Sequence, residues 1–234
     1  MGDRLSLAPD LSCRATSANV HGTQPIGHVV CAAHDQVAID RQGLGFLAKI
    51  YMPQFVILNF ALWPLGSFPV AQTDLAVGFS PWQLVSYAFL HANIAHLFFN
   101  MFGLWMFGRV LEQVWGGYRF LAFYAVCIVG AAITQLVVVS FFDTGPIAPT
   151  VGASGGVFGV LLAFGMMFPE ARVMLLIPPI PMKAKFFVVG YGALELFFGV
   201  TGTQSGVAHF AHLGGMVFGL GLLLYWRSQG RLRN

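Results

Sequence analysis

Charge is scarce in this chain. Only 9% of its 234 residues are charged, against about 25% in an average soluble protein, while 57% are hydrophobic. This composition excludes an ordinary water-soluble domain. Because the twelve basic residues are scattered, it also argues against a nucleic-acid surface. We therefore predict an all-α membrane protein whose helices each use about 20 apolar residues to cross the lipid bilayer.

Cysteine is also scarce. Cys13, Cys31 and Cys127 are widely spaced, and the last of them lies inside an apolar run. Three cysteines in this arrangement exclude a disulfide framework and a cysteine-rich metal cluster. We expect no cofactor and no bound metal.

Six apolar runs follow one another along the chain, at about 46–66, 93–115, 118–141, 152–169, 184–201 and 205–226. Each is close to the length of a membrane-spanning helix. We therefore predict a six-helix membrane domain at 44–228. A polar tail at 1–43 is expected to be cytoplasmic and partly disordered, and a short basic cytoplasmic tail follows at 229–234.

Lysine and arginine are distributed unevenly around these runs. The loops at 67–92, 142–151 and 202–204 contain neither residue, so all twelve basic residues are expected on the opposite face of the membrane. The positive-inside rule then places both termini in the cytoplasm. For a compact multi-pass chain, this pattern predicts residence in a bacterial inner membrane.

Ser154 begins the fourth apolar run, within the small-residue segment 152–156. Small residues allow neighbouring helices to approach closely, and a helix N-terminus favours negative charge forming nearby. The segment also satisfies the G-x-S-x-G pattern of α/β-hydrolases, but the strand–turn–helix context of that motif is missing. Ser154 is therefore either a nucleophile or one more packing residue.

His212 is predicted to lie about seven residues into the sixth run. Gly215 and Gly219 follow on the same helical face, which favours close docking against the small-residue face of the fourth run. Such docking would bring the Ser154 hydroxyl within hydrogen-bond reach of the imidazole. The alternative is that His212 only donates a structural hydrogen bond.

His96 and Asn100 are four residues apart, so they share one face of the second helix, and His91 precedes them at the loop junction. Their donors could bind structural carbonyl groups. They could equally be aimed at the oxyanion that forms when a serine attacks an amide.

Glu195 and His209 are further polar residues at membrane depth. Glu195 has no obvious basic partner at its depth, and we do not assign it to a catalytic triad. A metal site built from His209, His212, His91 and His96 is disfavoured because neither histidine pair has a carboxylate at ligand spacing. A transporter or channel lined by His209, His212 and Glu195 is another alternative.

Taken together, three motifs resemble those of the rhomboid family of intramembrane serine proteases. They are the segment from His91 to Asn100, the segment around Ser154 and Gly155, and the segment from Ala211 to Gly219. The likeness extends over about residues 80–226. It implies a six-helix rhomboid-like bundle that cleaves peptide bonds in or near transmembrane segments of other membrane proteins. The expected partners are these transmembrane substrates and the membrane lipids.

The resemblance also implies roles for individual residues. Ser154 would be the nucleophile and His212 the general base of a Ser–His dyad, and His96, Asn100 and the Ser154 backbone N–H would bind the oxyanion. The supporting residues would be His91, Gly155, Phe158, Gly215 and Gly219. A rhomboid-like factor that binds or traffics membrane proteins without cutting them is the main alternative.

Two positions depart from the usual family pattern. Gln83 stands where many relatives have the arginine of a Trp-Arg pair, which puts the anchoring of the first loop in question. Phe158 stands one turn after Ser154, at a position that is often tyrosine. A phenylalanine there should still stack on His212.

Overall fold

The computed structural model describes residues 33–70, 75–142, 147–174, 179–203 and 206–230. These residues belong to one compact unit, Ala32–Asn234. Most of the expected N-terminal tail, residues 1–32, lies outside the described residues.

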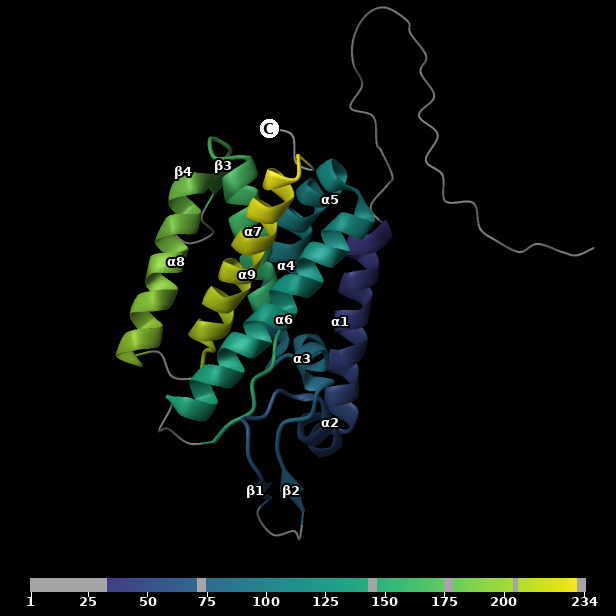
Figure 1. Ribbon diagram of the computed structural model, residues 1–234. Helices are drawn as coiled ribbons and strands as arrows, with labels where there is room; N and C mark the ends of the chain where they lie inside the picture. Colours follow the sequence, from purple (N-terminus) through teal and green to yellow (C-terminus); the bar gives the residue numbers. More distant parts are fainter. Residues whose placement is uncertain (1–32, 71–74, 143–146, 175–178, 204–205, 231–234) are drawn as a thin grey trace, which may run out of the picture. The chain divides into compact units, whose positions relative to one another are not determined.

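A bundle of helices dominates the described part of the chain (Figure 1). The bundle includes a continuous helical span, Ile94–Trp115, which joins α4 (Ile94–Gly103), the π-helical segment η2 (Leu104–Gly108) and α5 (Arg109–Trp115). It also includes α6 (Gly117–Phe141), α7 (Ser154–Met167), α8 (Ala184–Thr201) and α9 (His209–Ser228). Four helices in the described residues are long and apolar enough to cross a membrane: Ile94–Trp115, α6, α8 and α9. The expected count of six spans is not confirmed.

Helix α7 is apolar but short. Its 14 residues extend about 21 Å at 1.5 Å per residue, less than the roughly 30 Å thickness of the hydrocarbon core. A helix of this length cannot have both ends at the membrane surfaces unless its flanking segments enter the bilayer. We therefore expect at least one end of α7, at Ser154 or at Met167, to lie below the lipid surface.

The start of the fold differs from the sequence-based expectation. Helix α1 spans Ala33–Tyr51 and α2 spans Pro53–Phe60, so the predicted continuous run at 46–66 is wrong, and residues 33–43 are helical rather than part of a polar tail. The break has a local cause: Pro53 lacks the N–H that would continue α1, and it occupies the first turn of α2 instead.

Lys49 is also placed differently from the expectation. Because α1 begins early, its last turn reaches the loop before α4, where the Lys49 ammonium donates to the backbone carbonyls of His91 (2.7 Å) and Ala92 (2.9 Å). That loop was expected on the exported face. The prediction that all twelve basic residues share one face is therefore wrong for Lys49.

Short elements connect the helices. Strands β1 (Phe68–Pro69) and β2 (Ala76–Val77) pair antiparallel at one end of the bundle. Strands β3 (Arg172–Met174) and β4 (Pro181–Lys183) pair antiparallel at the opposite end, next to the start of α8 (Figure 1). Between β2 and α4 lie the short helix α3 (Gln83–Ser86) and the 3₁₀ turn η1 (Tyr87–Phe89).

Gln83 anchors the segment between α2 and α4. Its side chain is only 1% exposed, and its carbonyl oxygen accepts hydrogen bonds from the backbone N–H groups of Trp63 and Ser80, both at 3.2 Å. Its amide nitrogen donates a longer bond of 3.4 Å to the Asn59 carbonyl. An uncharged side chain thus ties this segment to the end of α2 through backbone groups.

The interior of the bundle is apolar, and large apolar side chains also cover its outer surface. Aromatic rings of Trp115, Phe123 and Trp226 meet at centroid distances of 5.1–6.1 Å and join α5, α6 and α9. Phe98, Val189, Phe197 and many other apolar residues are exposed. An apolar exterior of this kind fits a lipid environment.

Candidate active site

The segment that leads into α7 is held by backbone hydrogen bonds, and these place Ser154. Thr150 and Leu62 exchange two N–H···O bonds of 2.9 and 3.0 Å, and the Gly152 N–H donates to the Tyr87 carbonyl at 3.0 Å. Gly152 has φ +129, a conformation that L side chains rarely adopt. Ser154 is therefore the first residue of α7, as predicted, and the segment that leads into it is fixed by these backbone hydrogen bonds.

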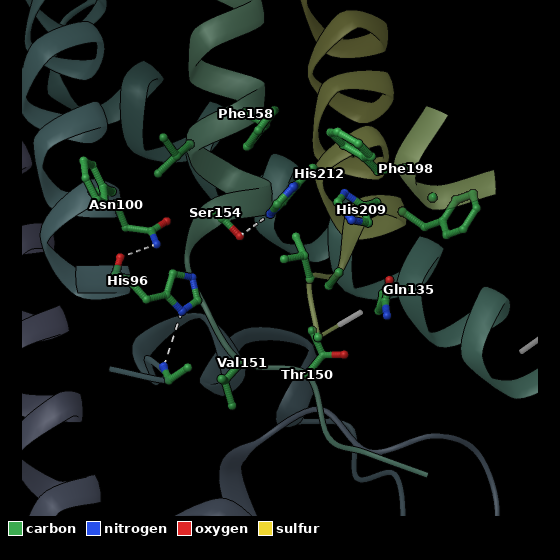
Figure 2. Close-up of a pocket in the computed structure, with 18 of the residues that line it drawn as sticks. His96, Asn100, Gln135, Thr150, Val151, Ser154, Phe158, Phe198, His209 and His212 are labelled. Atoms are coloured by element: carbon green, nitrogen blue, oxygen red, sulfur yellow. Dashed lines mark hydrogen bonds between the residues drawn. The ribbon is translucent and has the colours of Figure 1, made fainter. Parts of the chain in front are cut away.

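His212 faces Ser154 across the gap between α7 and α9 (Figure 2). Its Nε2 atom lies 2.7 Å from the Ser154 hydroxyl oxygen, a hydrogen-bond distance. The predicted position of His212 in its helix is corrected, however: α9 begins at His209, so His212 is the fourth residue and lies in the first turn. Both groups of the pair thus stand at helix starts.

Direct backbone contact between α7 and α9 sets this distance. A Cβ atom on Gly215 would lie 1.9 Å from the Gly155 carbonyl oxygen, which no side chain can tolerate. The predicted docking of two small-residue faces is therefore observed. Gly219 packs at a three-helix contact, close to Cys127 and Phe123 of α6 as well as to Gly159 of α7.

The Phe158 ring lies flat on the His212 imidazole. The two ring centroids are 4.2 Å apart and the ring planes differ by 6°. Stacking was expected for phenylalanine at this position, and the geometry agrees. The contact restricts rotation of the imidazole about its side-chain torsions.

His96 lies on the other side of Ser154, as Figure 2 shows. Its Nδ1 accepts a 3.3 Å hydrogen bond from the Ala92 backbone N–H, so in the neutral ring the proton resides on Nε2. A Cβ atom placed on Gly152 would lie 2.9 Å from this Nε2 atom and would also be close to the Ser154 hydroxyl oxygen. His96 therefore presents an N–H donor beside the serine.

Asn100 is buried in α4 and lines the same cavity. Its amide nitrogen donates to the His96 backbone carbonyl at 2.8 Å, which is the structural carbonyl contact considered from the sequence. An amide group has a second N–H, which this bond leaves available.

His91 is fully buried, and its ring meets the His96 ring edge-on at a centroid distance of 5.1 Å. Neither ring nitrogen has a hydrogen-bond partner within the described residues. Burial, with additional repulsion from His96 and Lys49, lowers the pKa of His91 to about 3. The ring is therefore a neutral packing element behind His96 at ordinary pH.

Glu195 has two partners that the sequence did not reveal. Its Oε2 atom lies 2.8 Å from Nδ1 of His212 and 2.7 Å from Nδ1 of His209. The expectation that Glu195 lacks a basic partner is wrong. The partners belong to the next helix, 17 and 14 positions along the chain, so a pattern within one helix could not show them.

Within the described residues, this trio is also the group that could hold a metal ion, because its potential ligand atoms lie within 4.8 Å of one another. The four-histidine site considered from the sequence does not form as a group of ligands. In the trio, the hydrogen bonds already use the groups that would have to bind a metal.

A cavity of about 1940 Å³ opens onto the serine and is lined by side chains from several helices. The polar residues that line it include His96, Asn100, Gln135, Ser154 and His212. Gln135 of α6 was not predicted as a site residue. It lies in no recognisable sequence motif, and it reaches the cavity through the packing of α6 against α9 (Figure 2).

The match to a known family covers most of this architecture. A family model described as Rhomboid domain matches residues 78–229, which include α4 to α9 and, with them, Ser154, His212 and His96. The chain belongs to the rhomboid family.

Relatives of this rhomboid come from several organisms. It is 28% identical over 175 residues to "Rhomboid protein 1, mitochondrial" of Saccharomyces cerevisiae, covering 69% of this chain and 48% of that protein. It is 29% identical over 193 residues to "Rhomboid protease GluP" of Bacillus subtilis, covering 79% and 35%. It is 23% identical over 188 residues to "Rhomboid protease GlpG" of Yersinia pestis, covering 80% and 60%.

This rhomboid therefore spans less than two thirds of the length of each of these relatives. Its membrane-spanning helices identify an integral membrane protein. The relatives include mitochondrial proteins, among them a second one from Danio rerio at 33% identity over 153 residues, 62% of this chain and 39% of that protein. A bacterial inner membrane, expected from the sequence, is not supported by these comparisons.

Proposed function

We propose that this rhomboid is a serine endopeptidase that hydrolyses peptide bonds in or near the transmembrane segments of other membrane proteins. The observation that carries the proposal is the 2.7 Å contact between the Ser154 hydroxyl and His212 Nε2. A serine is a weak nucleophile at neutral pH unless an adjacent base takes its proton. The names of two relatives, which describe them as rhomboid proteases, support the same activity.

In this mechanism His212 Nε2 takes the Ser154 proton as the oxygen attacks a substrate carbonyl. The negative charge on the carbonyl oxygen is met by the His96 Nε2–H, the second N–H of Asn100 and the backbone N–H at the start of α7, which has no acceptor within its own helix. His212 then gives the proton to the leaving amine, and water hydrolyses the acyl-enzyme by the reverse use of the same groups.

The substrate must present an accessible peptide bond. A transmembrane helix engages its carbonyl groups in its own hydrogen bonds, so it has to unwind locally before attack. We expect cleavage near small or helix-weakening residues, because unwinding costs least there. The cavity of about 1940 Å³ provides space for an extended segment and for water.

The decisive test uses purified protein in detergent, a serine-directed fluorophosphonate and a single-span reporter with a glycine- and alanine-rich segment. We expect the parent to be labelled at Ser154 and to cut the reporter, and Ser154→Ala and His212→Ala to do neither while keeping the parental unfolding temperature. A folded parent that is neither labelled nor active would favour the non-cleaving binding factor. Ion or solute flux that persists in Ser154→Ala proteoliposomes would favour a transporter.

A further inference from the structure

Helix α8 carries a carboxylate on a face where packing alone would favour an apolar residue. It is the least enclosed of the four long helices, with 17% of its membrane window buried against 44% for α6 and α9. Its buried residues are Ala184, Val188 and Glu195. An acidic group at membrane depth is costly unless it is paired, so its placement on this small buried face requires a specific role.

The hydrogen bonds around Glu195 determine where the histidine protons lie. One oxygen, Oε2, is within 2.8 Å of Nδ1 atoms from both His209 and His212. An ionised carboxylate accepts both bonds at once, whereas a protonated one could donate only one. Each neutral ring then carries its proton on Nδ1. His212 Nε2 is left with a lone pair, which is the form that accepts the Ser154 proton.

From this arrangement we infer that Glu195 is a positioning residue for His212, so that Ser154, His212 and Glu195 form a hydrogen-bonded chain. The carboxylate fixes the imidazole tautomer and stabilises the imidazolium that forms during attack. The inference rests on the proposed protease function. It goes further by adding a third residue, contributed by a different helix, to the Ser154–His212 pair.

His209 has a distinct part in the arrangement. Its Nδ1–H binds the same oxygen from the opening residue of α9, so it holds the carboxylate in place rather than contacting the serine. His209, His212 and Glu195 are 5–8% exposed, so little water competes for these bonds. The Nδ1 protonation that satisfies Glu195 also removes the Nδ1 lone pairs, so neither ring could bind a metal ion beside Glu195 Oε2 through that nitrogen without losing this proton.

The proton count is conserved through the reaction. The Ser154 proton moves to His212 Nε2 as the C–O bond forms, giving an imidazolium with protons on both nitrogens. When the C–N bond breaks, the Nε2 proton leaves with the amine and the neutral Nδ1–H ring returns. Glu195 remains a carboxylate throughout, because its role is to accept the Nδ1–H bond and not the proton.

The test compares Glu195→Gln, which keeps the volume but removes the charge, with Leu196→Ala, which shortens a half-exposed neighbour on the same helix. We expect Glu195→Gln to lower kcat roughly 10²- to 10⁴-fold with KM changed less than threefold, by analogy with the loss of the acid in serine-protease triads. The acidic limb of its rate–pH profile should move to lower pH by at least one unit. Leu196→Ala should keep the parental kcat and profile.

A second measurement needs no Glu195 variant to fold. ¹⁵N-histidine NMR of the parent, with the His212 signals assigned from their loss in His212→Gln, should show a neutral ring protonated at Nδ1. A ring protonated at Nε2 would overturn the inference, as would Glu195→Gln with parental kcat and an unmoved profile. Either result leaves the protease function intact if the parent cuts the reporter; a parent that does not cut it removes both proposals.

Discussion

The Phe158 ring provides a test at the scale of a single side chain. Removing a stacked ring should loosen the His212 imidazole, and aromatic contacts of this kind are worth about 0.5–1.5 kcal/mol, which corresponds to roughly a two- to tenfold change in rate. We expect Phe158→Ala to lower kcat on the single-span reporter by such a factor. Phe158→Tyr keeps the ring and should remain within twofold of the parent. An unchanged kcat in Phe158→Ala would contradict this role.

His91 predicts how stability depends on pH. Its folded pKa of about 3 lies below the unfolded value of about 6.5, so between these values the unfolded chain binds a proton that the folded chain does not. The free energy of unfolding is therefore highest above pH 6.5 and falls as the pH is lowered towards 3, by at most about 1.4 kcal/mol per pH unit. The free energy of unfolding, measured from unfolding curves at several pH values between 4 and 7, should depend less on pH in His91→Phe than in the parent. Equal slopes for both proteins would contradict the prediction.

Single residues also show what a sequence can reveal about a site. Ser154, His212 and His96 were identified because each lies in a short local motif, and the described geometry brings them together. The partners of Glu195 were missed because the contact joins two helices whose mutual rotation no local pattern specifies. Gln135 was missed for the same reason.

At the scale of elements, the contact between α7 and α9 can be tested with two glycines on one helix. A methyl group at Gly215 would collide with the Gly155 carbonyl, whereas one at Gly221 would meet nothing within 4 Å. We expect Gly215→Ala to lower the unfolding temperature and to reduce kcat at least tenfold, because the two helices must separate. Gly221→Ala should keep full activity and gain up to about 1 kcal/mol of helix stability.

The two variants are measured side by side, by thermal unfolding in detergent and by reporter cleavage. Equal behaviour of Gly215→Ala and Gly221→Ala would show that the close approach of α7 and α9 is not needed for the site.

The extents of the elements were predictable only where hydrophobicity was the main determinant. The expected runs at 118–141 and 184–201 closely match α6 and α8, and the run at 152–169 contains α7. The prediction of the first run, 46–66, was wrong for two reasons. Helix α1 contains polar residues, so its mean hydropathy did not indicate a membrane helix, and Pro53 separates α1 from the apolar helix α2. The last run was predicted to begin at 205, whereas α9 begins at His209 because a loop precedes it.

At the scale of the whole molecule, the distribution of charge predicts the orientation in the membrane. Arg172 in β3 lies towards the predicted cytoplasmic face, and Thr203 beyond α8 lies towards the exported face. In a cysteine-free background expressed in a bacterial host, we expect a membrane-impermeant maleimide to label Thr203→Cys in intact cells and Arg172→Cys only after lysis. The reverse pattern would invert the predicted topology.

The family could be predicted from the sequence because its three motifs occur in order along the chain, and the match over residues 78–229 confirms it. The number of spans could not be predicted, since α1 is too polar and α7 too short for a count based on length and hydropathy. Lys49 shows the same limit for topology: a basic residue can lie at the opposite end of the bundle when backbone carbonyls bind it.

The meeting of two main chains at Gly155 and Gly215 has a consequence for how this protein could diversify. Backbone atoms set the distance between α7 and α9, so cavity-lining side chains that do not contact Ser154, His212 or Phe158 can vary without altering it. If the proposed protease function holds, substitution of a lining residue such as Val157 could therefore change the cleavage preference without moving Ser154 relative to His212. We therefore expect the protein to tolerate substitutions best among the residues that line the cavity and least at the contact between Gly155 and Gly215.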